Sequence, residues 1–140
     1  MTTFKTSRVI PALPAEIFAA FVNPKRLAKW WGPAGFTNTF KQFEFTPGGK
    51  WSFVMHGPDG TNYPNESEFT DIVHNQKVVI RHHSQPNFTL TVRITNSVQS
   101  STVYWVQEFD NDEVAKKVAH IVEPSNEQNL DRLVDEVCGK

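Results

Sequence analysis

Apolar and polar residues alternate along the central part of the chain, from residue 36 to residue 109. Residues 51–55 and 88–94 each place an apolar side chain at every second position, which is the period of a strand with one buried face. Turns that contain glycine and proline separate such runs at residues 47–49 and 57–60. The pattern predicts a meander of about six antiparallel strands with one apolar and one polar face.

Helical spacing replaces this alternation near the N-terminus, after a first strand at residues 4–10. The apolar side chains at positions 17, 18 and 21 would form one stripe of a helix that begins at Pro14. A second helix is expected after Asn23, a favourable N-cap, and should end before Gly32-Pro33 because the residue before a proline avoids helical angles. Two short helices therefore follow the first strand.

Helical spacing returns in the last part of the chain. The apolar side chains at positions 114, 118, 121 and 122 predict a short helix, which Pro124 is expected to end. A longer helix would begin at the capping-box pair Ser125 and Gln128. Its stripe at positions 130, 133, 134 and 137 must be buried on the apolar face of the sheet. The order of elements indicates an α+β fold in a single domain, residues 1–140.

Charge and cysteine content narrow the classes of function. The 14 basic and 15 acidic side chains nearly cancel, for a formal net charge of -1. No basic field is available to bind nucleic acid or an anionic membrane, and no apolar run reaches the length of about 18 residues that a spanning helix needs. A single cysteine, Cys138, excludes an internal disulfide and suits a reducing compartment. We expect a cytoplasmic protein with neither nucleic acid nor a membrane as its partner.

Motifs for metal or covalent chemistry are absent from the sequence. The five histidines and Cys138 show none of the spacings of a zinc site, and the adjacent His82 and His83 must point to opposite faces of a strand. The chain also lacks a GxSxG nucleophile elbow and a glycine loop that opens a helix to hold phosphate. We predict no cofactor, no metal and no catalytic nucleophile.

Three separated motifs resemble one known family. NPKRLAKWWGP at residues 23–33, GGKWSFVMHGPDGTNYPN at 48–65 and NEQNLDRL at 126–133 occur in the order of the AHSA-like branch of the START-like (SRPBCC) superfamily. That branch is named after activators of the heat-shock chaperone's ATPase. The resemblance implies a helix-grip fold, in which a curved antiparallel sheet of six or seven strands encloses a cavity against a long C-terminal helix. Superfamily relatives bind lipids, sterols or plant hormones, cyclise polyketides or contact the chaperone.

Our leading hypothesis is that a small apolar or aromatic ligand occupies this cavity. Bulky side chains on the apolar face would form the wall, and polar side chains of the same parity would orient the ligand. The expected wall residues are Trp30, Trp51, Phe53, Met55, Phe88, Trp105, Leu130 and Leu133, and the expected orienting residues are His82 and Gln107.

Two other functions stay open. An enzyme of cyclase or hydrolase type would use His82 and a carboxylate as acid and base, because the reference pKa of histidine lies near neutrality. Glu66 and Glu68 share one face of a strand, but Phe69 and Ile72 have opposite parity and leave that face undecided. An interaction module that contacts the chaperone would need an exposed apolar patch. A homodimer is compatible with all three functions.

The adjacent tryptophans at the end of the second helix receive different predicted roles. Leu27 and Trp31 lie one helical turn apart, which favours Trp31 as the ring that anchors the helix to the sheet. Trp30 would then face the mouth of the cavity as a gate.

Overall fold

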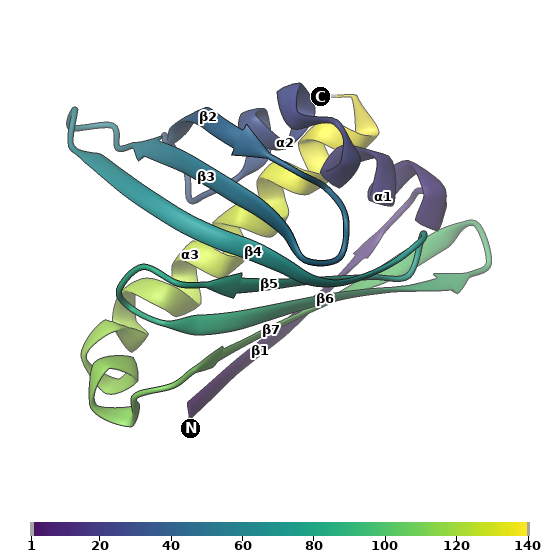
Figure 1. The fold of residues 1–140 in the computed structure, drawn as a ribbon. Helices are drawn as coiled ribbons and strands as arrows, with labels where there is room; N and C mark the ends of the chain where they lie inside the picture. Colours follow the sequence, from purple (N-terminus) through teal and green to yellow (C-terminus); the bar gives the residue numbers. More distant parts are fainter. Residues whose placement is uncertain (1, 140) are drawn as a thin grey trace.

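The computed structural model describes residues 2–139, which form a seven-stranded antiparallel sheet and three helices (Figure 1). The elements, in chain order, are β1 (Thr2–Ile10), α1 (Pro14–Val22), α2 (Pro24–Trp30), β2 (Thr37–Phe43), β3 (Gly49–His56), β4 (Asn62–Val73), β5 (Lys77–His82), β6 (Phe88–Ser97), β7 (Ser100–Phe109) and α3 (Asp112–Cys138).

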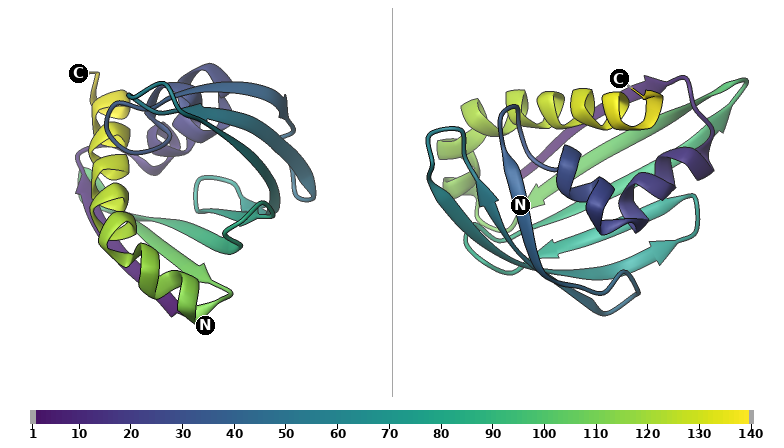
Figure 2. Two further views of the ribbon diagram at one scale, coloured as in Figure 1. Left: turned by 90° about the vertical axis from the view of Figure 1, so that its left-hand side faces the viewer. Right: turned by 90° about the horizontal axis from the view of Figure 1, so that it is seen from above.

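The sheet has the strand order β1-β7-β6-β5-β4-β3-β2, so β2 to β7 form a meander and β1 joins its far edge. The sheet curves around α3, which lies across its concave face, and the short helices α1 and α2 cover one end of that face (Figure 2). The predicted α+β class and the helix-grip arrangement are confirmed. No helix within residues 2–139 combines the length and the apolar character that crossing a bilayer requires.

In strand β7, successive side chains point alternately to the concave and the convex face of the sheet. Val103, Trp105 and Gln107 are buried on the concave side, whereas Tyr104 is exposed on the convex side. The neighbouring strand β6 buries Leu90 in the same way. The inner parity predicted for β5, β6 and β7 is therefore correct.

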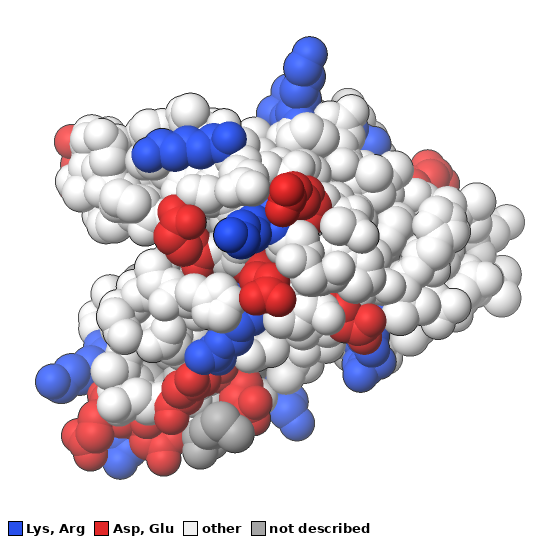
Figure 3. Space-filling model, viewed as in Figure 1, with Lys and Arg blue, Asp and Glu red and all other residues white. Residues whose placement is uncertain are grey.

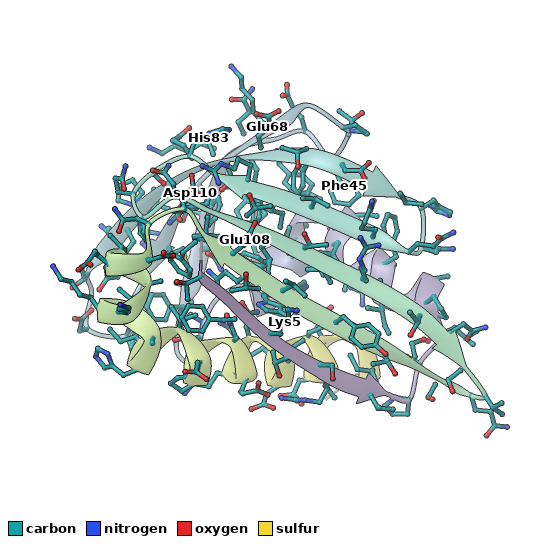
Figure 4. All side chains as sticks on the ribbon, turned by 90° about the horizontal axis from the view of Figure 1, so that it is seen from below. Lys5, Phe45, Glu68, His83, Glu108 and Asp110 are labelled. Atoms are coloured by element: carbon teal, nitrogen blue, oxygen red, sulfur yellow. The ribbon has the colours of Figure 1, made fainter. Side chains whose placement is uncertain are left out.

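A bulge in β4 explains the parity conflict in this strand. Ser67 and Phe69 point inward, but the pairing with β5 shifts register between Phe69 and Asp71. The extra residue returns Ile72 to the core side, because one inserted residue reverses the alternation. Glu68 is placed on the convex face, where it faces His83 (Figure 4).

The last helix corrects the prediction of a break at Pro124. Helix α3 is continuous and contains Pro124, so Ser125 and Gln128 lie inside it and do not begin a new helix. Proline in a helix interior removes one backbone hydrogen bond and costs about 3 kcal/mol. Ala115 before the proline and Leu130 after it are both buried, so packing on both sides outweighs the local preference.

Candidate functional site

A cavity of about 500 Å³ lies between the concave face of the sheet and α3. This volume is within the range of small-molecule sites. The β3–β4 hairpin and the β5–β6 loop, with Gln85 and Pro86, form part of its rim. Figure 3 shows the molecular surface notched between these two segments, at the left of the view. The cavity is therefore open at the end of the sheet that α1 and α2 leave uncovered.

The apolar part of the wall comes from the inner face of four strands and from the segment after α2. Side chains on alternate positions of β3, β5, β6 and β7 supply most of it, since these positions share one face. The apolar wall residues are Trp31, Phe53, Met55, Ile80, Phe88, Leu90 and Trp105.

The polar part of the wall contains nearly all the buried polar residues of the described chain. Five of the six line the cavity, namely Asn65, Ser67, His82, Gln107 and Asn129. The sixth, Ser101, donates to the carbonyl oxygen of Ala12 at 2.7 Å and lies elsewhere. Buried polar groups need partners, so their concentration here marks this part of the interior as different from the core.

His82 is held in one orientation by its neighbours. Its ring stacks on Phe88 with centroids 4.4 Å apart, and its Nδ1 lies 2.9 Å from the carbonyl oxygen of Pro86. A carbonyl only accepts, so Nδ1 donates to it when this nitrogen carries the ring proton. Burial lowers the pKa of His82 below its ordinary value, against the smaller raising effect of these hydrogen bonds. The lowered pKa favours the neutral ring, in which one of the two nitrogens carries the proton.

The Nε2 atom of His82 faces two polar side chains. The hydroxyl of Ser84 lies 3.3 Å away and the carboxamide oxygen of Asn65 lies 2.5 Å away. The amide nitrogen of Asn65 donates to the carbonyl oxygen of Tyr63 at 2.8 Å, so its carboxamide oxygen faces the ring and accepts from Nε2 when that nitrogen carries the proton. His82 and Asn65 thus form one polar unit of the wall.

A second polar unit joins β7 to α3. The Nδ2 of Asn126 donates to the Oε1 of Gln107 at 3.1 Å. Within residues 2–139, the amide nitrogen of Gln107 and the hydroxyl of Ser67 have no hydrogen-bond partner. Both residues line the cavity, so these groups are free to bond a molecule inside it.

Helix α3 holds the segment that follows α2 through three polar side chains. Gln128 accepts from the backbone of Ala34, and Asn129 bonds Trp30 and Gly32. The guanidinium of Arg132 donates to five backbone carbonyls at 2.6–3.2 Å, those of Lys29, Trp31, Gly32, Pro33 and Phe36. Motifs that are about 100 residues apart in the sequence therefore meet in space, and Arg132 fixes residues 29–36 against α3.

The structure exchanges the predicted positions of the two tryptophans. Trp30 is only 1% exposed, donates through Nε1 to the carbonyl of Ala20 at 3.0 Å, and does not line the cavity. Trp31 lines it. The prediction from helical spacing failed because α2 ends at Trp30. Trp31 has extended backbone angles, which turn its ring away from the face of the helix that carries Leu27. The position expected for Trp30 is therefore wrong.

Six of the ten predicted site residues line the cavity: Phe53, Met55, His82, Phe88, Trp105 and Gln107. Besides Trp30, three others lie in the packed core. Trp51 is stacked between Phe53 and Phe69, and Leu130 and Leu133 are fully buried on the inner side of α3. Helix α3 instead reaches the cavity with Ser125, Asn126 and Asn129.

Two signals in the sequence could have found the missed polar residues. Asn65 and Ser67 share the parity of the buried Phe69. Asn126 and Asn129 lie on the helical face adjacent to Leu130 and Leu133, at spacings of three and four. Gly32 also lies beside the wall, where its φ of +96° and a Cβ position 2.7 Å from the methyl of Met55 favour glycine.

Acid–base and metal chemistry find little support in this geometry. Among the lining residues within 2–139, none is Asp or Glu, and no cluster of histidine, cysteine or carboxylate side chains in that range could hold a metal ion. Glu66 is exposed and accepts from Ser52 at 2.7 Å. Within residues 2–139, His82 therefore has no carboxylate beside it in the cavity, which the alternative hypothesis of an enzyme requires.

Comparisons with solved structures agree with this architecture. A protein from Arthrobacter aurescens is similar at a TM-score of 0.91 with 22% identity, over 99% of this chain and 87% of that one. A protein from Nitrosomonas europaea gives 0.89 with 14% identity, over 98% and 94%. The AHSA1 protein from Silicibacter pomeroyi gives 0.77 with 20% identity, over 98% of each chain. At these identities the likeness shows the fold alone.

Comparison of the sequence with protein-family models identifies the family of the chain. No curated protein matches the chain. The family model described as "Activator of Hsp90 ATPase homolog 1-like protein" matches residues 11–137, which include all three motifs and every element except β1 and the last residue of α3. The chain therefore belongs to the family of Activator of Hsp90 ATPase homolog 1-like proteins, within the START-like superfamily.

Proposed function

We propose that the protein binds a small apolar or aromatic molecule in the cavity between the sheet and α3. The observation that carries this proposal is the concentration of five buried polar residues around an opening whose remaining wall is mostly aromatic and aliphatic. Small-molecule sites combine an apolar wall with a few convergent polar groups in this way. Contact with the rings supplies affinity, at about 25 cal/mol per Å² of apolar area removed from water, and Gln107 and Ser67 supply orientation.

Catalysis of a cyclase or hydrolase type is the weaker alternative. It needs an acid and a base within hydrogen-bond reach of one position in the cavity. His82 is engaged with the carbonyl of Pro86, and the two carboxylates considered from the sequence, Glu66 and Glu68, belong to the convex face. The arrangement supports binding and orientation of a ligand better than proton transfer to it.

Contact with a chaperone and formation of a homodimer stay predictions. The family description refers to the chaperone ATPase activator, but the exposed large apolar side chains are spread over several elements, among them Val9, Leu13, Val98 and Ile121. A cytoplasmic location is likewise part of the proposal, and the single cysteine supports it.

Thermal unfolding in the presence of a panel of aromatic and amphipathic compounds tests the proposal. A ligand at one hundred times its dissociation constant contributes about 2.7 kcal/mol, which raises Tm by roughly 8 °C for a chain of this size. The variant Ser67→Phe places a ring in the cavity and should lose this response.

The matched control for that variant is Thr95→Phe, which adds the same ring at an exposed position of β6. It should keep the full response. If no compound in the panel raises Tm, or if Ser67→Phe responds as strongly as the wild type, the proposed function is wrong.

A further inference from the structure

The wall of the cavity is free of formal charge. Within the described residues, none of the side chains that line it is Asp, Glu, Lys or Arg, although such residues make up 21% of the chain. Its two titratable members are His82 and Tyr63. Burial lowers the pKa of His82, which favours its neutral form, and Tyr63 is at the rim, 45% exposed. A molecule inside the cavity meets no opposite charge.

Charged side chains of neighbouring elements make their contacts outside the cavity. Arg132 belongs to the helix that borders the cavity, but its guanidinium is directed to five backbone carbonyls and does not line the wall. Other cations are paired outside the cavity. These pairs are Arg26 with Glu136 at 2.8 Å, Lys77 with Asp71 at 2.6 Å, and Arg81 with Asp110 at 2.5 Å.

The groups that remain available in the wall are neutral. The amide nitrogen of Gln107 is a donor, and the hydroxyl of Ser67 is both donor and acceptor. The carboxamide oxygen of Asn126 is an acceptor beside Gln107, because its amide nitrogen makes the bond between them. These groups can form hydrogen bonds with a carbonyl, hydroxyl or amide of a ligand, and neither partner then carries a charge.

From the charge-free wall and these free neutral groups, we infer that the cavity selects an uncharged ligand, with an apolar or aromatic body and a neutral hydrogen-bonding group such as an amide or an alcohol. A carboxylate or ammonium group in the same position loses its water and gains no counter-charge, which is costly. A neutral amide loses less and finds donors and an acceptor at the wall. This inference rests on the proposed function and names the class of its ligand.

Calorimetric titration at pH 7.5 with three probes of one skeleton tests the inference. The probes are naphthamide, naphthoate and naphthylmethylammonium, which share the ring and differ in the charge of the substituent. The amide should bind at least ten times more tightly than either ion.

A charge placed in the wall should redirect this selectivity. Gln107→Glu keeps an acceptor for Asn126 and adds a carboxylate, so it should bind the ammonium probe at least ten times more tightly than the wild type does. Gln42→Glu makes the same change at an exposed position of β2 and should behave as the wild type.

The outcomes separate the two proposals. Naphthoate or the ammonium probe binding the wild type as tightly as naphthamide overturns the inference and leaves the proposed function intact. Unchanged ammonium binding in Gln107→Glu also overturns the inference. If none of the three probes binds and no compound of the thermal panel binds either, both proposals fail.

Discussion

The inner face of the sheet consists of two regions with the same architecture and different contents. The filled half, defined by Trp30, Trp51, Phe69, Val78 and Leu133, is packed under α1, α2 and one end of α3. The hollow half, defined by the five cavity-lining polar residues Asn65, Ser67, His82, Gln107 and Asn129, borders the cavity. The same strands and the same helix cross both halves. The two halves therefore differ in the side chains that each element places there, which are apolar in the filled half and partly polar around the cavity.

Strand β5 shows this change within five residues. Val78 and Ile80 are buried as ordinary apolar strand residues, and His82, next on the same face, belongs to the polar wall. In α3 the change runs from Leu133 to Asn126 over two helical turns. Close-packed apolar side chains leave little space, whereas polar side chains must keep hydrogen-bond partners and therefore border space that a partner can enter.

Truncation of a ring in the filled half should have the largest effect. Trp51→Ala removes a fully buried side chain that stacks on Phe53 and Phe69, and should lower the free energy of unfolding by about 3–5 kcal/mol. Phe88→Ala in the cavity wall, where the ring is half-buried, should cost about half as much or less. Urea denaturation of both variants measures the difference, and equal losses would remove the distinction between the two halves.

Replacement of the Arg132 guanidinium should have an intermediate effect on stability and should also affect ligand binding. Arg132→Lys replaces a guanidinium that serves five carbonyls with a single ammonium, and should lower the free energy of unfolding by about 2 kcal/mol. It should also weaken ligand binding, since residues 29–36 carry Trp31 to the cavity. Arg93→Lys, at an exposed position of β6, is the matched control and should change neither quantity. A destabilised variant with unaltered ligand affinity would show that this segment plays no part in binding.

The polar wall should contribute more to binding than to stability. Gln107→Leu removes the free donor and should change the free energy of unfolding by less than about 1 kcal/mol, because an apolar group in a partly open site replaces a polar one. Its affinity for naphthamide should fall about tenfold. Denaturation and calorimetry on the same preparation check both values, and a strongly destabilised Gln107→Leu would identify Gln107 as a structural residue.

The pH dependence of stability should show the smallest effect, with a definite sign. The pKa of His82 is lowered in the folded state, mainly by burial, so the unfolded chain binds more protons below pH 6.5. Stability should therefore fall by about 1 kcal/mol as the pH drops from 7.5 to 5.5. The aspartates with lowered pKa, such as Asp71 and Asp110, titrate below this window.

Two histidine variants test whether His82 causes this pH dependence of stability. His82→Gln should flatten it, whereas His120→Gln, at an exposed position of α3, should leave it unchanged. A slope that survives in His82→Gln would come from another group.

The period of two and the turn residues were sufficient to predict the sheet, its inner parity and the aromatic side of the wall. Phe53, Met55 and Trp105 could be placed from alternation alone, since a strand has only two faces. The bulge near Asp71 could not be predicted, because it depends on how β4 pairs with β5. The size of the cavity could not be predicted from the sequence either, because the volume left between the sheet and α3 depends on the curvature of the sheet.

Helix boundaries account for the remaining errors. Pro124 is locally unfavourable inside α3 but is tolerated because packing on either side is strong. Trp31 is expected from the sequence to anchor α2 to the sheet because the predicted helix includes it, and one residue of error at a helix end changes the direction of a ring. Leu130 and Leu133 were expected in the wall because an apolar stripe predicts burial but not the region that it covers.

The four tryptophans offer the most direct test of the division into two halves. Trp31 and Trp105 line the cavity, while Trp30 and Trp51 belong to the filled half or its packed border. In a titration with naphthamide followed by the indole N–H resonances in a ¹H–¹⁵N spectrum, Trp31 and Trp105 should show the largest shifts, and Trp30 and Trp51 should move little. Equal shifts of all four signals, or larger shifts of Trp30 and Trp51, would contradict the account.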